Sequence, residues 1–307
     1  MVGHRLAPVT RRGFMAGAAA DLSLFAPRPG LAQTGSPPPG TGSHGRCYVI
    51  KGGAVMSMDP KVGDFAKADV LVEGKKILAI GPDLGDRHGT VIDATGRIVM
   101  PGFIDTHHHQ FETALRSYLA DGVLILDGDP SPRAADAYYT SILLGFAPAY
   151  RPQDVYVSEV FGGLSQLDDG VTTVHDVSQI HHTPEYSDAA VKALFDTGRR
   201  AAFGYFEGAG QGMAIKTEKY AYPGDAERIA KQHFSSKDQL VHMILGGEVY
   251  LGPETAQKSW ALGRKLGLQI AAHILAPFGI RPIFDQFAQG KGGAGDTATA
   301  PTTCSST

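Results

Sequence analysis

The feature that most restricts the fold is a regular alternation of apolar, β-rich segments with helical ones after residue 100. The expected strands read, in order, GFIDTHHH, GVTTVHDVS, RRAAFGYFEG, DQLVHMILGGEVY and LQIAAHILAP. One of the helices between them is expected at residues 187–198, with Ser187 as its N-cap and Gly198 at its end. Five strand-then-helix units in succession predict an α/β protein with a parallel sheet. The simplest form is an incomplete (β/α) TIM-type barrel with about five of eight strands.

An open, doubly wound sheet is the alternative architecture. We rank it second because no Gly-rich dinucleotide-binding turn follows the first expected strand. Before the barrel, residues 47–100 contain short β-rich runs separated by Gly, Asp and Pro turns, which predict a small antiparallel, β-sandwich-like unit. Residues 101–290 would then form the partial barrel domain.

The two ends of the chain have a different composition. Residues 1–32 contain Arg11–Arg12 followed by a small-residue apolar segment, and this resembles a bacterial twin-arginine export signal. A disordered tail with a chance Arg-Arg pair is the other interpretation. Residues 33–46 are expected to be a flexible linker, and residues 291–307, rich in Thr, Ala, Gly and Ser, are expected to be disordered. The protein would be periplasmic or exported, or cytoplasmic if the signal is not used.

Charge and hydrophobicity exclude several classes of partner. The formal net charge is −3, and acidic and basic residues are mixed without a long basic run, so we expect no nucleic acid partner. No stretch of eighteen apolar residues occurs, which argues against a membrane-spanning helix. Cys47 and Cys304 alone do not define a disulfide framework, and their pairing stays open.

Three consecutive histidines end the first expected barrel strand. Side chains two residues apart on a strand point to the same side, so His107 and His109 can share one metal ion while His108 faces away. Neutral imidazole suits Zn²⁺, and Fe²⁺ or Mn²⁺ are also acceptable. A divalent ion with an open coordination position lowers the pKa of its bound water toward about 7. The alternative is that these are loop histidines without a metal.

The small β unit, GFIDTHHH and the strand–helix alternation together resemble the amidohydrolase superfamily of metal-dependent hydrolases, and GVTTVHDVS and GLQIAAH add to the likeness. The resemblance spans roughly residues 47–290 and favours the branch with cytosine deaminases, guanine deaminases and triazine hydrolases. It implies that His273 is a third metal ligand. It also implies hydrolysis of a non-peptide carbon–nitrogen bond, such as deamination of a small nitrogen heterocycle, by attack of metal-bound hydroxide. The resemblance implies that family members with two metal ions carry a carbamylated lysine at the end of the fourth strand. No lysine ends that strand here, so one divalent ion, Zn or Fe, is expected.

The end of the sequence departs from the family pattern. The family uses a histidine at the end of the sixth strand and an aspartate at the end of the eighth, and no histidine follows His273. Asp285 lies in a helical pattern and Asp296 in a segment without an apolar run, so no catalytic residue is assigned. We therefore expect a C-terminally shortened family member, whose exposed sheet edges would allow homo-oligomers. The second functional hypothesis is an inactive remnant that at most binds metal.

Several other polar residues lie at expected strand ends. Candidates for contact with a small heterocyclic substrate are Gln110, Glu112, Glu207 and Glu248. His175 and Asp176 could line the barrel mouth or form a satisfied polar pair. His181 and His182 are expected in a loop, exposed to solvent rather than bound to substrate.

Overall fold

The computed structural model describes residues 46–85, 87–118, 138–208, 222–247, 253–273 and 304–306. The chain divides into two compact units, Met1–Pro101 and Gly102–Thr307. The expected export signal, residues 33–45 of the expected linker and Glu248 lie outside the described residues. None of the helices in the described ranges has the length and hydrophobicity that crossing a bilayer requires.

The first unit contains a five-stranded sheet in the order β3-β2-β1-β4, with β5 also paired to β1. Its strands are β1 (Cys47–Val55), β2 (Phe65–Glu73), β3 (Lys76–Gly81), β4 (Thr90–Asp93) and β5 (Ile98–Val99). The first three form an antiparallel meander, as predicted. β4 and β5 run parallel to β1, which corrects the expectation of antiparallel pairing. The chain has to cross from β3 at one edge to β1 at the other, and this crossover reverses the direction in which β4 arrives.

The second unit contains a parallel sheet in the order β11-β10-β9-β8-β7-β6. Its strands are β6 (Phe103–His108), β7 (Val171–Ser178), β8 (Arg200–Tyr205), β9 (Val241–Gly246), β10 (Gln269–His273) and β11 (Cys304–Ser306). The first five lie where the alternation predicted them, and they form the curled sheet of an incomplete TIM-type barrel. β11 places three residues of the expected disordered tail in a strand beside β10, which corrects that expectation for these residues.

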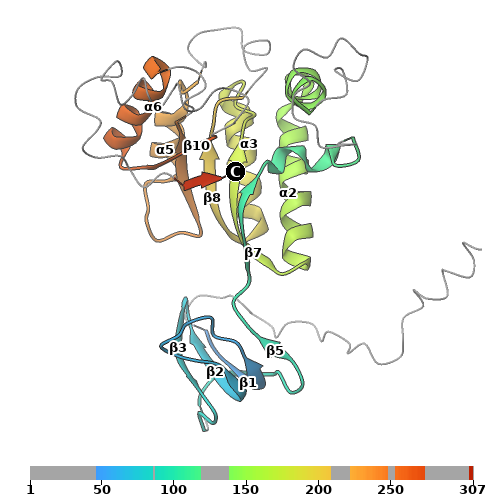
Figure 1. Ribbon diagram of the computed structural model, residues 1–307, viewed down its shortest axis with the longest axis vertical. Coiled ribbons are helices and arrows are strands. Elements are labelled where there is room, and N and C mark those ends of the chain that lie inside the picture. The colour runs from blue at the N-terminus through green and yellow to red at the C-terminus, as the bar shows by residue number, and fades with distance from the viewer. Residues whose placement is uncertain are drawn as a thin grey trace, which may run out of the picture. The chain divides into compact units, whose positions relative to one another are not determined.

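Helices separate these strands and flank the sheet (Figure 1). The helical elements are η2 (Gln110–Leu115), η4 (Tyr139–Phe146), η5 (Ala147–Ala149), α2 (Pro152–Asp168), α3 (Pro184–Thr197), α5 (Ala226–His233) and α6 (Pro253–Leu266). α3 ends, as predicted, at Gly198, whose φ of 70° is in the left-handed region that glycine favours. The helix begins at Pro184 rather than at Ser187, because proline is well suited to the first helical turn. Ser187 is consequently buried inside α3 and is not an N-cap.

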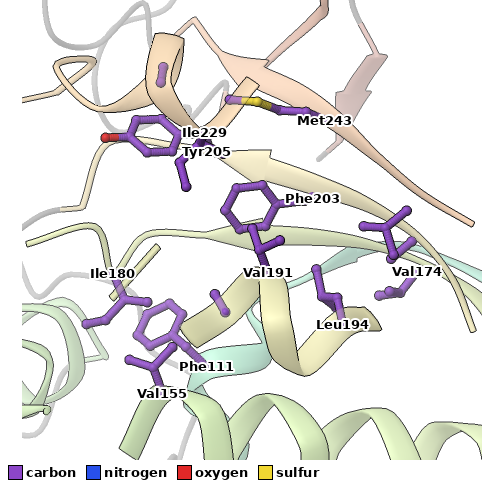
Figure 2. Packing of buried hydrophobic residues seen from close by; sticks show 14 of the residues in the cluster. Phe111, Val155, Val174, Ile180, Val191, Leu194, Phe203, Tyr205, Ile229 and Met243 are labelled. Atoms are coloured by element: carbon purple, nitrogen blue, oxygen red, sulfur yellow. The ribbon is translucent and has the colours of Figure 1, made fainter. Parts of the chain in front are cut away.

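The core of the second unit lies between the sheet and its helices. Figure 2 shows Phe203 of β8 directed toward Val191 and Leu194 of α3, with Tyr205 close to Ile229 of α5. All five side chains are buried in the same hydrophobic cluster. Burial of this apolar surface is what holds β8 and its helices in place.

Close packing also joins α2 to η2. A Cβ atom on Gly162 would lie 2.4 Å from Thr113 Oγ1 and 3.0 Å from Gln110 Cγ. The absence of a side chain at Gly162 therefore lets α2 approach the segment that directly follows the three histidines.

The burial of α3 generates a matched test of the core. Leu194 of α3 is 0% exposed, whereas Leu164 of α2 is 53% exposed. We predict that Leu194→Ala lowers the free energy of unfolding by about 2–5 kcal/mol, because it leaves a cavity. Leu164→Ala should change it by no more than about 0.5 kcal/mol. Urea unfolding followed by circular dichroism measures both, and equal losses would contradict this description of the core.

Candidate metal centre

Three imidazole rings converge at one end of the parallel sheet. His107 lies in β6, His109 directly follows that strand, and His273 is the last residue of β10. The Nε2 atoms of His107 and His109 are 3.2 Å apart, and those of His107 and His273 are 3.3 Å apart. The rings of His109 and His273 stack with their centroids 5.2 Å apart.

The curl of the sheet brings these rings together. β6 and β10 are the first and fifth strands and have β7, β8 and β9 between them. In a flat sheet, at about 4.8 Å per strand, they would lie about 19 Å apart. Rings on opposite strands can meet at 3.3 Å only because the sheet curves and both strands direct these histidines to the inside.

The protonation of His109 is set by its surroundings. Its Nδ1 lies 2.8 Å from the carbonyl oxygen of Val177, which can only accept, so Nδ1 carries the proton and the Nε2 lone pair is free. Burial, followed by the charges of His273 and His107, holds the pKa of His109 well below its ordinary value. Burial, followed by the charge of His273, lowers the pKa of His107 to about 4. Both rings are therefore neutral at pH 7.

This donor set fits a divalent metal ion. Two nitrogen ligands about 2.05 Å from one ion at a tetrahedral angle lie about 3.3 Å apart. The two Nε2 separations of 3.2 and 3.3 Å agree with that spacing. The ligand nitrogens of His107, His109 and His273 all lie within 4.8 Å of one another, so the three rings could hold one such ion.

His108 faces away from this group, as the strand alternation predicts. Its Nδ1 lies 3.0 Å from Asp105 Oδ2 and 3.3 Å from the Nε2 of Gln166 on α2. The middle histidine therefore contacts the layer between β6 and α2 rather than the other two rings.

The residues expected to contact substrate differ in their burial and hydrogen-bond partners. Glu112 is buried, accepts a 2.6 Å hydrogen bond from Tyr138, and lines a pocket of about 440 Å³ together with the three consecutive histidines. Glu207 is half-buried after β8, where its backbone carbonyl accepts a hydrogen bond from Gln179. Gln110 is fully buried, and both N–H groups of its amide are used by Glu159.

Four polar residues lie near the end of β7 or just after it. His175 lines a small cavity of about 20 Å³ with His107 and His273, and Asp176 is buried on the other face of the strand. His181 and His182 are 1% and 2% exposed, which corrects their expected exposure to solvent. The reason is that His181 stacks on Tyr205, with the ring centroids 4.1 Å apart, and bonds the Ser178 carbonyl. His182 bonds the carbonyl oxygen of Ala147.

Two charged residues near this site were not singled out from the sequence. Glu159 of α2 and Arg199, which precedes β8, are 0% and 3% exposed. Single charged residues in an amphipathic helix or at a strand start are typical of solvent-facing positions, so the sequence pattern carried no signal for them.

The sequence model of the amidohydrolase family matches residues 98–290, more than half of the chain. The chain belongs to the amidohydrolase family. Members of this family typically bind a divalent metal, in agreement with the donor set described above. The matched residues include His107, His109 and His273.

Two deaminases are similar to about half of this chain. It is 31% identical over 157 residues to a 5'-deoxyadenosine deaminase from Methanosarcina mazei, covering 51% of this chain. It is 35% identical over 155 residues to a 5-methylthioadenosine/S-adenosylhomocysteine deaminase from Symbiobacterium thermophilum, covering 50% of this chain. In both cases 32% of the relative is covered, so the match spans about a third of their length.

Solved structures show the same fold. A triazine hydrolase from Arthobacter aurescens superposes with a TM-score of 0.60 at 22% identity, covering 81% of this chain and 56% of that chain. An adenosine deaminase from Xanthomonas campestris with bound Zn gives a TM-score of 0.55 at 18% identity, covering 79% and 55%. At these identities the likeness concerns the fold alone.

Burial of Glu112 predicts a pH dependence of stability. Burial raises the pKa of Glu112 to about 7 from its ordinary 4.5. Between these two pH values the folded chain keeps a proton that the unfolded chain releases, so this residue lowers stability as the pH rises through that window. Glu112→Gln removes the effect while keeping an acceptor for Tyr138. We predict that the stability of this variant relative to the wild type increases from pH 5 to pH 8 in urea unfolding.

The matched control is Glu254→Gln on α6. Glu254 is exposed, and its hydrogen bond to Lys258 lowers the pKa of its carboxyl group. The control should therefore show no gain at pH 8. A Glu112→Gln difference that does not change with pH would contradict the burial argument.

Proposed function

We propose that this chain is a metal-dependent hydrolase that cleaves carbon–nitrogen bonds other than peptide bonds in small nitrogen heterocycles, for example by deamination. The observation that carries the proposal is the convergence of three Nε2 atoms, at separations of 3.2 and 3.3 Å, at the carboxyl ends of the first and fifth barrel strands. Active sites of such barrels lie at this end of the sheet. Membership in the amidohydrolase family and the deaminase relatives support the same reaction class.

The chain's own residues would have distinct roles in this reaction. His107, His109 and His273 would hold one divalent ion, Zn or Fe, and the Val177 carbonyl would keep His109 in the tautomer that leaves Nε2 free. When bound, such an ion activates water as a nucleophile and polarises the substrate. The proton-transfer group is not assigned within the described residues.

Substrate contacts are proposed from position. Glu112 lies in the pocket next to the histidines, and Glu207 follows β8 at the carboxyl end of the sheet. With its raised pKa, Glu112 would present a carboxyl group that gains or loses a proton near pH 7. Glu248 keeps its proposed role from sequence alone, whereas burial of the Gln110 amide disfavours direct substrate contact for that residue.

A second candidate function is metal binding without turnover. One observation favours it: within the described ranges, the group that could hold a metal consists of three histidines and contains no carboxylate. In the family pattern, an aspartate after the eighth strand ligates the metal and moves protons. The second function would apply if no group in this chain takes over proton transfer.

Three further proposals rest on sequence. The Arg11–Arg12 motif and the apolar segment behind it support twin-arginine export to the periplasm. Composition supports a linker at residues 33–46 between that signal and the β unit. The pattern of five expected barrel strands supports self-association through the edge strands of the sheet.

The metal site is tested by single histidine replacements. We predict that the full chain binds one equivalent of Zn²⁺, and that His109→Ala weakens zinc binding by more than the about 10–100-fold typical of losing an outer hydrogen-bond partner. His108→Ala is the matched control, because its ring faces Asp105 and Gln166 instead. Competition with a chelating indicator measures both affinities. Equal effects of the two replacements would contradict the assigned ligands.

The reaction is tested by ammonia release. We predict that the zinc-loaded chain releases ammonia from at least one member of a panel of purine nucleosides, pyrimidines and triazines, and that His107→Ala abolishes the release. Production of ammonia is followed by a coupled enzymatic assay. One equivalent of tightly bound zinc with no ammonia from any member would favour the second candidate function.

A further inference from the structure

A buried polar cluster lies behind the metal site. It consists of Gln110, Glu159, Asp176 and Arg199, which are 0%, 0%, 0% and 3% exposed, and we call it the Gln110 cluster. Its members come from η2, α2, β7 and the residue before β8. Asp176 lies between His175 and Val177, which line the cavity beside the histidine ligands, so strand alternation directs Asp176 to the opposite face.

Gln110 contacts each of the other three members. Its Nε2 donates to the carbonyl oxygen and to Oε2 of Glu159, both at 2.8 Å. Its backbone N–H lies 3.4 Å from Asp176 Oδ1. Its Oε1 accepts a hydrogen bond from Nη2 of Arg199. Gln110 is therefore the member that holds the cluster together.

The cluster contains two carboxyl groups and one guanidinium. Burial, followed by the charge of Asp176, raises the pKa of Glu159 well above its ordinary value, and burial raises the pKa of Asp176 to about 7. Glu159 Oε1 and Asp176 Oδ2 are buried and lack hydrogen-bond partners among the described residues. One carboxyl group therefore keeps a proton near neutral pH, and the remaining carboxylate balances Arg199. A third negative charge would have no partner here.

The cluster is joined directly to a proposed metal ligand, because Gln110 follows His109. The β6–β7 pairing is irregular after Asp105 and ends with His108 opposite Asp176. Beyond that pair, His109 bonds the Val177 carbonyl at 2.8 Å and the Gln110 N–H lies 3.4 Å from Asp176. Two consecutive residues after β6 are thus tied to two consecutive residues of β7, at the point where the regular backbone pairing stops.

We propose that Gln110 is a positioning residue. Its side-chain amide is held between Arg199 and Glu159 and thereby fixes the backbone after His109. This keeps the His109 ring hydrogen-bonded to the Val177 carbonyl, with Nε2 toward the metal site. The importance of this for metal binding rests on the proposed function. The position of the His109 ring does not depend on a bound metal. The positioning role of Gln110 and the proposed metal site can therefore be tested separately.

The test replaces Gln110 in the full chain. Gln110→Glu keeps the shape but adds a third carboxyl group and removes both donors to Glu159. We expect zinc affinity, measured by indicator competition, to fall about 10–100-fold, as for loss of other outer partners of metal ligands. In the metal-free protein, we expect the slowly exchanging Nδ1–H signal of His109 in ¹⁵N-edited NMR spectra to be lost or shifted. If the added charge of Gln110→Glu prevents folding, Gln110→Met replaces it as the test variant. Methionine is neutral and of similar length, and this variant should show the same loss of zinc affinity and the same change in the His109 signal.

The rescue variant exchanges the two partners. In Gln110→Glu combined with Glu159→Gln, the number of carboxyl groups is unchanged, Arg199 keeps an acceptor and residue 159 becomes the donor. This double variant should recover most of the zinc affinity and the His109 signal. The matched control is Ser187→Ala, which removes a buried hydrogen bond to His181 and has no link to His109. It should lower stability without changing either readout.

The outcomes separate the two proposals. Wild-type zinc affinity and an unchanged His109 signal in Gln110→Glu, with zinc binding lost in His109→Ala, would overturn the positioning role alone. Unchanged zinc affinity in His109→Ala would overturn the proposed metal site, and the His109 signal of the Gln110 variants would then decide the positioning role. If both single Gln110 variants lose zinc affinity and the His109 signal and the exchange variant recovers neither, the positioning role of Gln110 would also be contradicted.

Discussion

The curvature of the parallel sheet is the constraint on which the rest of this structure depends. β6 and β10 have three strands between them, yet the Nε2 atoms of His107 and His273 are 3.3 Å apart. This curvature requires a continuous layer of helices and apolar side chains on the outside, which the cluster around Phe203 and Leu194 supplies. The chemistry proposed on the inside is therefore a result of packing on the outside.

The two faces of the sheet use burial in opposite ways. On the inside, burial keeps the rings of His107 and His109 neutral, and neutral imidazole is the form that binds a cation. On the outside, burial keeps a proton on the pair formed by Glu159 and Asp176, so that a single arginine balances the cluster. A single short segment, His109–Gln110, takes part in both environments.

Much of the fold followed from periodicity. The five strands of the curled sheet and the end of α3 at Gly198 were predictable, because alternating apolar patterns and a left-handed glycine act locally. The shared direction of His107 and His109 could be anticipated from strand alternation, and the place of His273 beside them from the resemblance to the amidohydrolase superfamily. Their distances could not, since these depend on sheet curvature.

What the sequence did not reveal depends on tertiary contacts. Glu159 and Arg199 have the side chains of surface residues and are buried because they meet Gln110. His181 and His182 follow a strand, where exposure to solvent is expected. They are buried because His181 stacks on the Tyr205 ring and His182 bonds a backbone carbonyl oxygen. The parallel arrival of β4 depends on a crossover that no local pattern encodes.

The wide spacing of the three histidines has a consequence for how the molecule assembles. His273 lies 166 residues after His107, so an unfolded chain would have to close a very long loop to bring both onto one ion. An ion that requires all three rings consequently distinguishes chains in which β6 and β10 are both in place from those in which either strand is missing from the sheet. Its binding free energy would add to the cooperativity of folding, because binding of the cation and docking of β10 would each make the other more favourable.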